Sequence, residues 1–102
     1  MGNFYTSAKW RHLREVILRR DGYKCQLSKR YGKNIPADNV HHIFPREEFP
    51  EYTYEPWNLI SLNHSKHTEM HVPSTGELSE AGIELLRKTA RKYNKEIPLR
   101  YQ

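Results

Sequence analysis

Five of the six histidines in this 102-residue chain lie between positions 41 and 71. His41 and His42 are adjacent, and His67 and His71 are four residues apart, so on a helix the second pair shares one face. Neutral imidazoles bind divalent metals through one ring nitrogen, and three such ligands leave positions open for a phosphate oxygen and a water. A further imidazole that titrates near neutral pH can take the proton from an attacking water. The histidines therefore have the chemistry of a metal-dependent hydrolytic site.

Neither histidine pair is specific by itself. A pair four residues apart occurs by chance on many exposed helices, and adjacent histidines are more often structural or on the surface. The order is more informative, because His41 and His42 stand in one strand-like segment, Asn58 in the next, and His67 in a helical segment after it. Neighbouring residues of a regular strand point to opposite faces, so His41 and His42 serve one site only where the strand twists strongly or ends.

Hydrophobic spacing and turn residues predict a small α+β framework around these histidines. The first helix begins at a serine cap and carries apolar residues at helical spacing. After the first middle strand a loop of about a dozen residues follows, a length that is usually functional or disordered in small domains. The predicted elements are a helix over 7–20, a short strand over 23–27, strands over 39–44 and 57–62, a short helix from Asn63 to about 72, and a final helix from Ser79 to about 94.

The composition indicates a single globular domain over residues 1–102. The chain is 36% hydrophobic and 12% aromatic with a mean hydropathy of −0.94, which predicts a modest core and argues against disorder. Its longest apolar stretches, such as 16–18, have three residues, so no membrane span is expected. The N-terminus lacks a signal-peptide pattern, and the one cysteine excludes an internal disulfide framework. We expect an intracellular, cytoplasmic protein.

The net charge of +5 is unevenly distributed. Residues 1–31 carry eight basic and two acidic side chains, residues 32–77 three and seven, and residues 78–102 six and three. Two basic flanks around a histidine-bearing acidic middle are compatible with a phosphate backbone held on either side of a site. A merely solvated basic surface explains the charge equally well. Arg14 falls inside the apolar stripe of the first helix, where it needs a carboxylate or a phosphate as its partner.

Over nearly its whole length, the sequence resembles the HNH endonuclease family, and in particular the small phage-encoded type. The resemblance implies a ββα-metal core over about 38–72, flanked by an N-terminal and a C-terminal helix. It rests on the segments Trp10–Arg14, Val16–Cys25, Asn39–Pro45, Trp57–Leu62 and His64–His71.

The resemblance also implies a role for each residue of the motif. By position, His41 and His67 match metal ligands, and His42 matches the general base. Asn58 matches the asparagine that fixes the loop and so orients the base. His71 resembles the extra ligand of the branch that has a His-x3-His helix. One divalent ion is implied, Mg²⁺, Mn²⁺, Ni²⁺ or Zn²⁺.

The sequence departs from the family at the structural zinc site. Many relatives carry two Cys-x2-Cys knuckles, and the matching positions here are Cys25, Ser28, Asn63 and Lys66. Because only one of the four thiolates is present, no zinc knuckle is expected, and this small fold lacks the stabilisation that a structural metal supplies. We expect hydrophobic packing to replace it, contributed by Trp10, Tyr23, Leu27, Trp57 and Leu62.

The resemblance therefore implies a metal-dependent endonuclease that hydrolyses phosphodiester bonds in DNA. Its expected partners are DNA and, if the source is a phage, DNA-packaging proteins; no membrane partner is expected. The alternative is a non-catalytic DNA-binding or assembly module that retains the fold. The expected contacts to the DNA backbone are Lys9, Arg11, Arg14, Arg19, Arg20, Lys24, Lys29 and Arg30.

Overall fold

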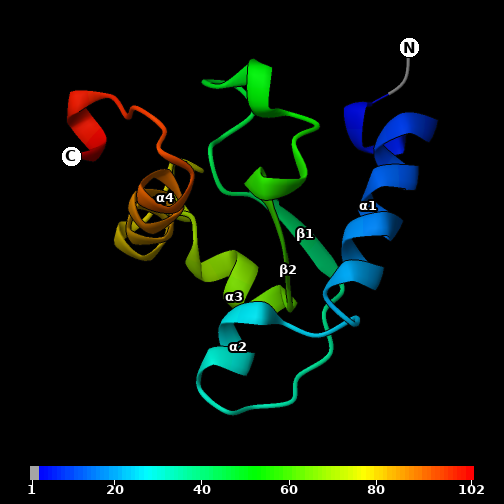
Figure 1. The fold of residues 1–102 in the computed structure, drawn as a ribbon. Helices are drawn as coiled ribbons and strands as arrows, with labels where there is room; N and C mark the ends of the chain where they lie inside the picture. The colour runs from blue at the N-terminus through cyan, green and yellow to red at the C-terminus, as the bar shows by residue number, and fades with distance from the viewer. Residues whose placement is uncertain (1–2) are drawn as a thin grey trace.

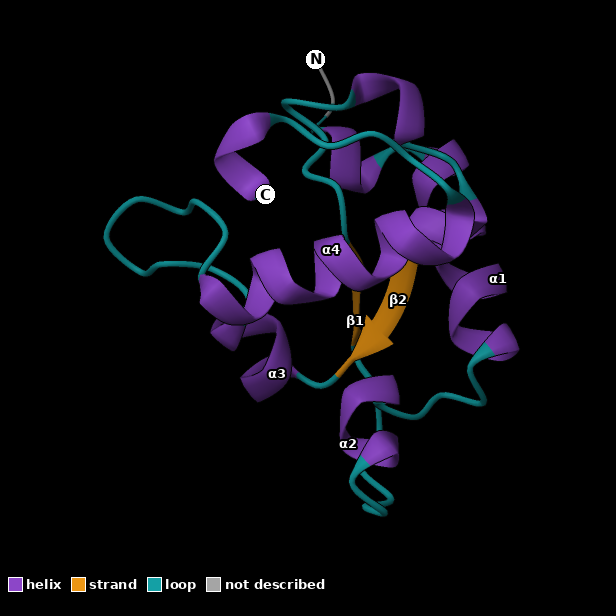
Figure 2. Ribbon diagram, turned by 60° about the vertical axis from the view of Figure 1, so that its left-hand side comes forward, coloured by secondary structure: helices purple, strands orange, loops and turns teal. Residues whose placement is uncertain are grey.

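A computed structural model describes residues 3–102 and places a two-stranded antiparallel sheet between helices (Figure 1). Strand β1 (Asn39–His42) pairs with β2 (Leu59–Leu62), with His41 opposite Ile60. Helix α1 (Ala8–Arg20) covers one face of the sheet, and α3 (His64–Glu69) and α4 (Glu80–Tyr93) cover the other. In Figure 2, α4 crosses in front of the strands and α1 lies to their right. The α+β class predicted from the sequence is confirmed.

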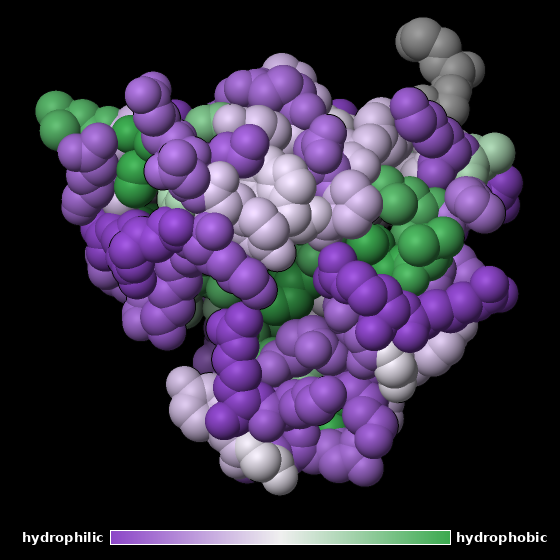
Figure 3. Space-filling view, in the orientation of Figure 1, coloured by the Kyte–Doolittle hydropathy of each residue, from purple (hydrophilic) through white to green (hydrophobic). Residues whose placement is uncertain are grey.

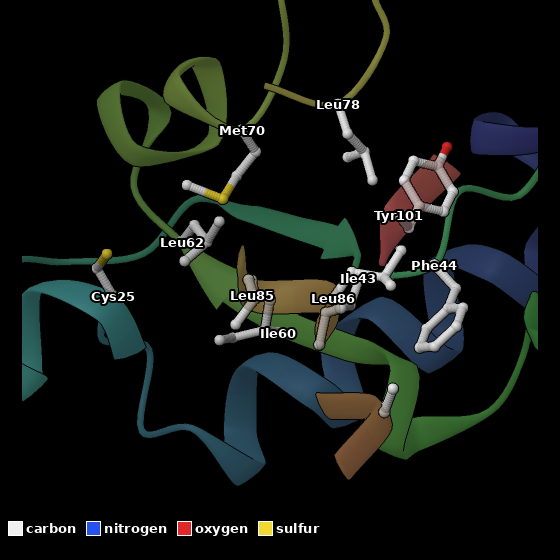
Figure 4. Packing of buried hydrophobic residues seen from close by; sticks show 11 residues of the cluster. Cys25, Ile43, Phe44, Ile60, Leu62, Met70, Leu78, Leu85, Leu86 and Tyr101 are labelled. Atoms are coloured by element: carbon white, nitrogen blue, oxygen red, sulfur yellow. The ribbon is translucent and has the colours of Figure 1, made fainter. Parts of the chain in front are cut away.

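The alternation of strand side chains divides the core into two clusters. Val40 of β1 and Leu59 of β2 pack on α1 beside Trp10 and Ile17. On the other face, Ile60 and Leu62 of β2 pack on α3, α4 and the segments beside them. This larger cluster is drawn in Figure 4, and it includes Ile60, Leu62, Met70, Leu85 and Leu86.

Helices α1, α3 and α4 each begin at the N-cap residue that the sequence predicts. The side chains of Ser7, Asn63 and Ser79 accept hydrogen bonds from the backbone N–H groups three residues later. These bonds satisfy donors that the first helical turn leaves free. The connections contain the short helix α2 (Gln26–Arg30) and the 3₁₀ turns η2 (Pro50–Tyr52) and η3 (Pro56–Asn58). Two further 3₁₀ turns, η1 (Phe4–Thr6) and η4 (Leu99–Tyr101), precede α1 and follow α4.

The strand predicted over 23–27 is wrong. Tyr23 has a positive φ of 58°, and its N–H bonds back to the Leu18 carbonyl, which closes the end of α1. Lys24 forms only an isolated bridge with Pro36, and α2 begins at Gln26. Tyr23 is 45% exposed, so it does not join the packing expected to replace the zinc knuckle. The middle strands exist but are shorter than predicted, ending at His42 and beginning at Leu59.

The outer edge of β2 is covered by the last residues of α1. Asp21 Oδ2 accepts a hydrogen bond from the Ser61 N–H at 3.1 Å, and an Nη atom of Arg20 donates to the Leu59 carbonyl at 2.7 Å. Arg20 also donates to both carboxylate oxygens of Asp21. These two side chains satisfy backbone groups that an unpaired edge strand exposes. The edge of β1 that does not pair with β2 is not covered in this way by any of the described residues.

Hydrophilic side chains cover most of the face shown in Figure 3, and a hydrophobic stretch reaches the surface near its centre. Within residues 3–102, no helix combines the length and the apolar character that a membrane crossing requires.

Candidate metal centre

Three imidazoles meet beside β1. His41 comes from β1, His67 from α3, and His71 from the turn two residues beyond the end of α3. One ligand nitrogen from each lies within 4.8 Å of the other two, and the ring centroids are 5.3 to 5.5 Å apart. The structure thus brings together the three predicted ligands, although α3 ends at Glu69 and not near 72. His64 is exposed and stands outside this group.

His41 has an unsatisfied buried nitrogen. The residue is 1% exposed, and its Nε2 finds no hydrogen-bond partner among the described residues. Burial lowers the pKa of His41 well below its ordinary value, and the neighbouring His67 and His71 add to that shift. A buried ring nitrogen without a partner is unfavourable, and the neutral imidazole is the form that binds a cation.

The other two imidazoles are also prepared for ligation. Burial, followed by the charges of His71 and His64, lowers the pKa of His67, which favours its neutral form. His71 Nδ1 lies 3.1 Å from the Gly76 carbonyl. Because a carbonyl only accepts, Nδ1 carries the hydrogen and the lone pair of His71 is on Nε2. The positive φ of Gly76, 77°, belongs to the turn that brings this carbonyl back to His71.

His42 lies on the opposite face of the sheet. Its ring stacks on Trp10 of α1, with centroids 4.9 Å apart and planes inclined by 22°. Its Nε2 is 3.0 Å from the carbonyl of Thr53, so Nε2 carries the hydrogen and Nδ1 keeps its lone pair. Burial lowers the pKa of His42; the bond to Thr53 opposes this shift and the charge of Arg46 adds to it. The ring is therefore a neutral proton acceptor near neutral pH.

One cavity reaches both faces of β1. Its volume is about 280 Å³, and four consecutive residues of β1, Asn39–His42, line it together with His67 and His71. Consecutive strand residues line one cavity only when it follows the edge of the strand. His41 and His42 diverge as expected, yet both reach the cavity because it wraps around the free edge of β1, close to the end of the strand.

Asn58 ties the segment after β1 to the long loop. It is 0% exposed, and its Oδ1 accepts from the Phe44 N–H at 2.7 Å. Its Nδ2 donates to the carbonyls of Phe44 and Tyr52, at 3.1 and 3.2 Å. Tyr52 directly precedes Thr53, the hydrogen-bond partner of His42. The amide of Asn58 thus links the segment after β1 to the loop that contains Thr53.

A solved structure shares this arrangement of elements. The chain is similar to the HNH endonuclease of the deep-sea thermophilic bacteriophage GVE2, crystallised with a manganese ion, with a TM-score of 0.62 and 27% sequence identity over 89% of this chain and 79% of that one. The chain has the fold of an HNH endonuclease. No protein-family model and no curated protein matches it. In the HNH fold, β1, β2 and α3 form the ββα unit, as the resemblance predicted.

The knuckle positions of this HNH fold still converge, but through hydrogen bonds. Ser28 Oγ donates to Cys25 Sγ at 3.2 Å, and Cys25 Sγ lies 3.6 Å from Asn63 Oδ1. The same Asn63 oxygen accepts from the Lys66 N–H at 2.9 Å. This four-residue polar cluster joins the start of α2 to the start of α3, at the positions that the resemblance matches to the zinc knuckles.

The basic residues expected at the DNA are distributed unevenly around the HNH fold. Of the eight, Arg14 alone lines the histidine cavity, and its guanidinium donates to the Asp38 carbonyl at 2.6 Å. Arg20 is engaged at β2. The other six are exposed on α1, on α2 or between these helices: Lys9, Arg11, Arg19, Lys24, Lys29 and Arg30.

Sequence reasoning did not single out three residues that shape the site. Tyr5 and Arg46 line it, and Thr53 bonds to His42. Arg46 follows the His-His-Ile-Phe-Pro segment directly, and this proximity to the motif was the one available signal for it. Nothing in the sequence pattern marked Tyr5 or Thr53, because they lie in turns that have no periodicity.

Proposed function

We propose that this protein is a divalent-metal-dependent endonuclease that hydrolyses phosphodiester bonds in DNA. The observation that carries the proposal is one cavity with two kinds of imidazole. Three imidazoles whose ligand nitrogens lie within 4.8 Å of one another stand on one side of β1, and a neutral imidazole with a free Nδ1 stands on the other. In this combination the three clustered imidazoles hold a cation on one side of a phosphate, and the fourth imidazole acts as a base on the other side.

His41, His67 and His71 are the proposed ligands, and the unsatisfied Nε2 of His41 is the feature that fits a cation. When bound, the ion supplies a Lewis acid that polarises the phosphate and stabilises the leaving oxygen. Three protein ligands leave coordination positions for substrate and water. The similar phage enzyme was crystallised with manganese. Mg²⁺, Mn²⁺, Ni²⁺ and Zn²⁺ are the ions to test.

His42 is the proposed general base. Its Nδ1 takes a proton from a water whose oxygen bonds to phosphorus, while the bond from phosphorus to the leaving sugar oxygen breaks. Trp10 and the Thr53 carbonyl hold the ring and its tautomer, and Asn58 holds the loop that carries Thr53. Asn58 is therefore a positioning residue.

The proposed DNA contacts are the basic residues of α1 and α2, which bind phosphates without reading sequence. Arg20 adds charge there while its donors hold β2 and Asp21. We treat residues 1–102 as one nuclease domain acting in the cytoplasm of a bacterial or phage-infected cell. Because the similar enzyme comes from a bacteriophage, phage DNA-packaging proteins are the further partners to test.

The test is incubation of supercoiled plasmid with the protein and each of the four ions, with a chelator as control. Nicked or linear product that depends on the ion supports the proposal. Binding of DNA in a mobility-shift assay, without cleavage with any of the four ions, contradicts it. That result favours a non-catalytic DNA-binding or assembly module.

A further inference from the structure

Arg46 has an unusual environment at the histidine cavity. It lies four residues beyond His42 and lines the cavity that holds all four site histidines. Its Nε is buried and has no hydrogen-bond partner within the described part of the chain. The nearest carboxylate is that of Glu47, an exposed side chain 3.9 Å from an Nη atom, at the limit of an ion pair. Within residues 3–102 the guanidinium donates no hydrogen bond to the protein, although neighbouring side chains hold it in place.

Two aromatic rings hold the guanidinium of Arg46. The Cζ of Arg46 is 4.2 Å from the ring centroid of Phe4 and 5.5 Å from that of Tyr5, both in or beside the N-terminal turn η1. A guanidinium over an aromatic face is attracted by the ring quadrupole and keeps its N–H groups, in the plane of the guanidinium, free for another partner. Phe4 in turn packs against Trp10, the ring that stacks on His42.

Three other arginines of this protein use their donors to hold the backbone. Arg14, Arg20 and Arg87 each donate to backbone carbonyls, at 2.6, 2.7 and 2.7 Å. Arg46 donates to no backbone carbonyl of residues 3–102. A cation with unused donors beside a cluster of imidazoles raises the local positive potential, which is unfavourable unless the cavity receives an anion.

We propose that Arg46 binds the non-bridging oxygens of the scissile phosphate through its guanidinium, and that Phe4 positions it. The inference rests on the proposed function and names a residue that the family motif does not include. Guanidinium groups match phosphate geometry with paired N–H donors, and donors that are already oriented stabilise the charge that grows on the phosphate during attack. The N-terminal turn is then part of the substrate site.

The test compares Arg46→Ala and Arg46→Lys with Lys33→Ala, which removes the same charge from an exposed position away from the cavity. Cleavage of a duplex oligonucleotide with Mn²⁺ gives kcat and KM, and calorimetry gives Mn²⁺ affinity. We expect Arg46→Ala to lower kcat/KM by about 10²–10³-fold, as for loss of an oriented donor, with Mn²⁺ affinity unchanged. Arg46→Lys should recover part of the loss and Lys33→Ala should lose less than twofold.

Phe4→Leu tests the positioning step, because leucine keeps apolar packing and removes the ring face. It should lower kcat by about 2- to 5-fold, the value of a cation–π contact, and leave Mn²⁺ affinity unchanged. Arg46→Ala that cleaves like the parent overturns the inference. So does a loss of Mn²⁺ affinity as large as the loss of cleavage, because it assigns Arg46 a structural role.

The same variants separate this inference from the proposed function. If the parent binds duplex DNA but cleaves it with none of the four ions, the nuclease proposal fails. Weaker binding by Arg46→Ala than by Lys33→Ala, measured by fluorescence anisotropy, then still supports a phosphate contact at Arg46. If the parent neither binds nor cleaves DNA, both proposals are overturned.

Discussion

The carbonyl oxygen of Thr53 accepts a hydrogen bond from Nε2 of His42 across 3.0 Å and eleven residues of chain. This bond sets the tautomer of His42 and turns Nδ1 toward other partners. Thr53 is held in turn, since its hydroxyl donates to the Pro50 carbonyl at 2.7 Å within η2. A loop between the two strands thus determines which ring nitrogen of His42 keeps its lone pair.

Replacing His42 by alanine should abolish most cleavage without affecting the ion. We expect the cleavage rate to fall by about 10²–10⁴-fold, the contribution of a general base. Mn²⁺ affinity should not change, because His42 lies across β1 from the three clustered histidines. Plasmid cleavage and calorimetry measure the two effects, and His12→Ala, a histidine loss on an exposed face of α1, is the control. Cleavage at the parental rate would remove His42 from the mechanism.

Replacing His67 or His71 by alanine should, unlike His42→Ala, weaken the binding of the metal ion. Loss of groups that merely orient a ligand weakens metal binding by about 10–100-fold, so loss of a ligand should weaken it by at least about 100-fold. Calorimetric titration with Mn²⁺ and Ni²⁺ measures the affinity. His64→Ala, on the same helix but outside the cluster, is the matched control. If His71→Ala binds both ions like the parent, His71 is no ligand.

The secondary structure was predictable where it depends on local sequence features such as helix caps. The caps Ser7, Asn63 and Ser79, each followed by helical spacing, correctly predicted where α1, α3 and α4 begin. The segment 23–27 misled because Tyr23, Cys25 and Leu27 alternate as in a strand. The hydrogen bond from the Tyr23 N–H to the Leu18 carbonyl gives that tyrosine a left-handed conformation instead, and alternation alone does not reveal it.

The candidate site was predictable in its parts but not in its shape. The order of His41, His42, Asn58 and His67 indicated one site, and the resemblance added His71 as a third metal ligand. The three rings of His41, His67 and His71 do meet. That one cavity would wrap around the edge of β1 depends on how α1 and α3 pack on opposite faces. Contacts of that kind, such as the guanidinium of Arg46 over Phe4, join segments about 40 residues apart and leave no periodic signal.

Without metal, the protein should lose stability as the pH falls below about 6.5. The folded protein holds the pKa values of His41, His42 and His67 below that ordinary value, chiefly by burial. The unfolded chain therefore binds more protons as the pH falls from about 6.5 toward the lowered values, and each histidine removes up to about 1.4 kcal/mol of unfolding free energy per pH unit. Stability is complete above this window and declines within it.

Urea unfolding at pH 7.5, 6.5 and 5.5 in the presence of a chelator measures this decline. His41→Gln is the informative variant, since it keeps a polar side chain of similar size and removes the most buried of the three titrating rings. Its stability should depend less steeply on pH than that of the parent. Equal slopes for the two proteins would show that His41 takes up no extra proton on unfolding.

Restoring the three missing thiols should restore a zinc site. Ser28 Oγ and Asn63 Oδ1 already lie 3.2 and 3.6 Å from Cys25 Sγ, and the N–H of Lys66 bonds to the same Asn63 oxygen. The combined variant Ser28→Cys, Asn63→Cys and Lys66→Cys should therefore bind one additional Zn²⁺ through four thiolates and raise the unfolding temperature when zinc is present.

The absorption spectrum of bound Co²⁺ distinguishes this site from the histidine centre, because only thiolate ligands give sulfur-to-cobalt charge-transfer bands. The variant that also carries Cys25→Ser is the control, and its bands should be weaker. Asn63 caps α3, so the triple variant should be less stable than the parent without zinc, by about 1 kcal/mol for the lost cap. Absence of thiolate bands would mean that the four positions lie too far apart, or point too far away, to share an ion. In that case the hydrogen-bonded cluster is a different solution to joining α2 to α3 and not a zinc site whose ligands have been replaced.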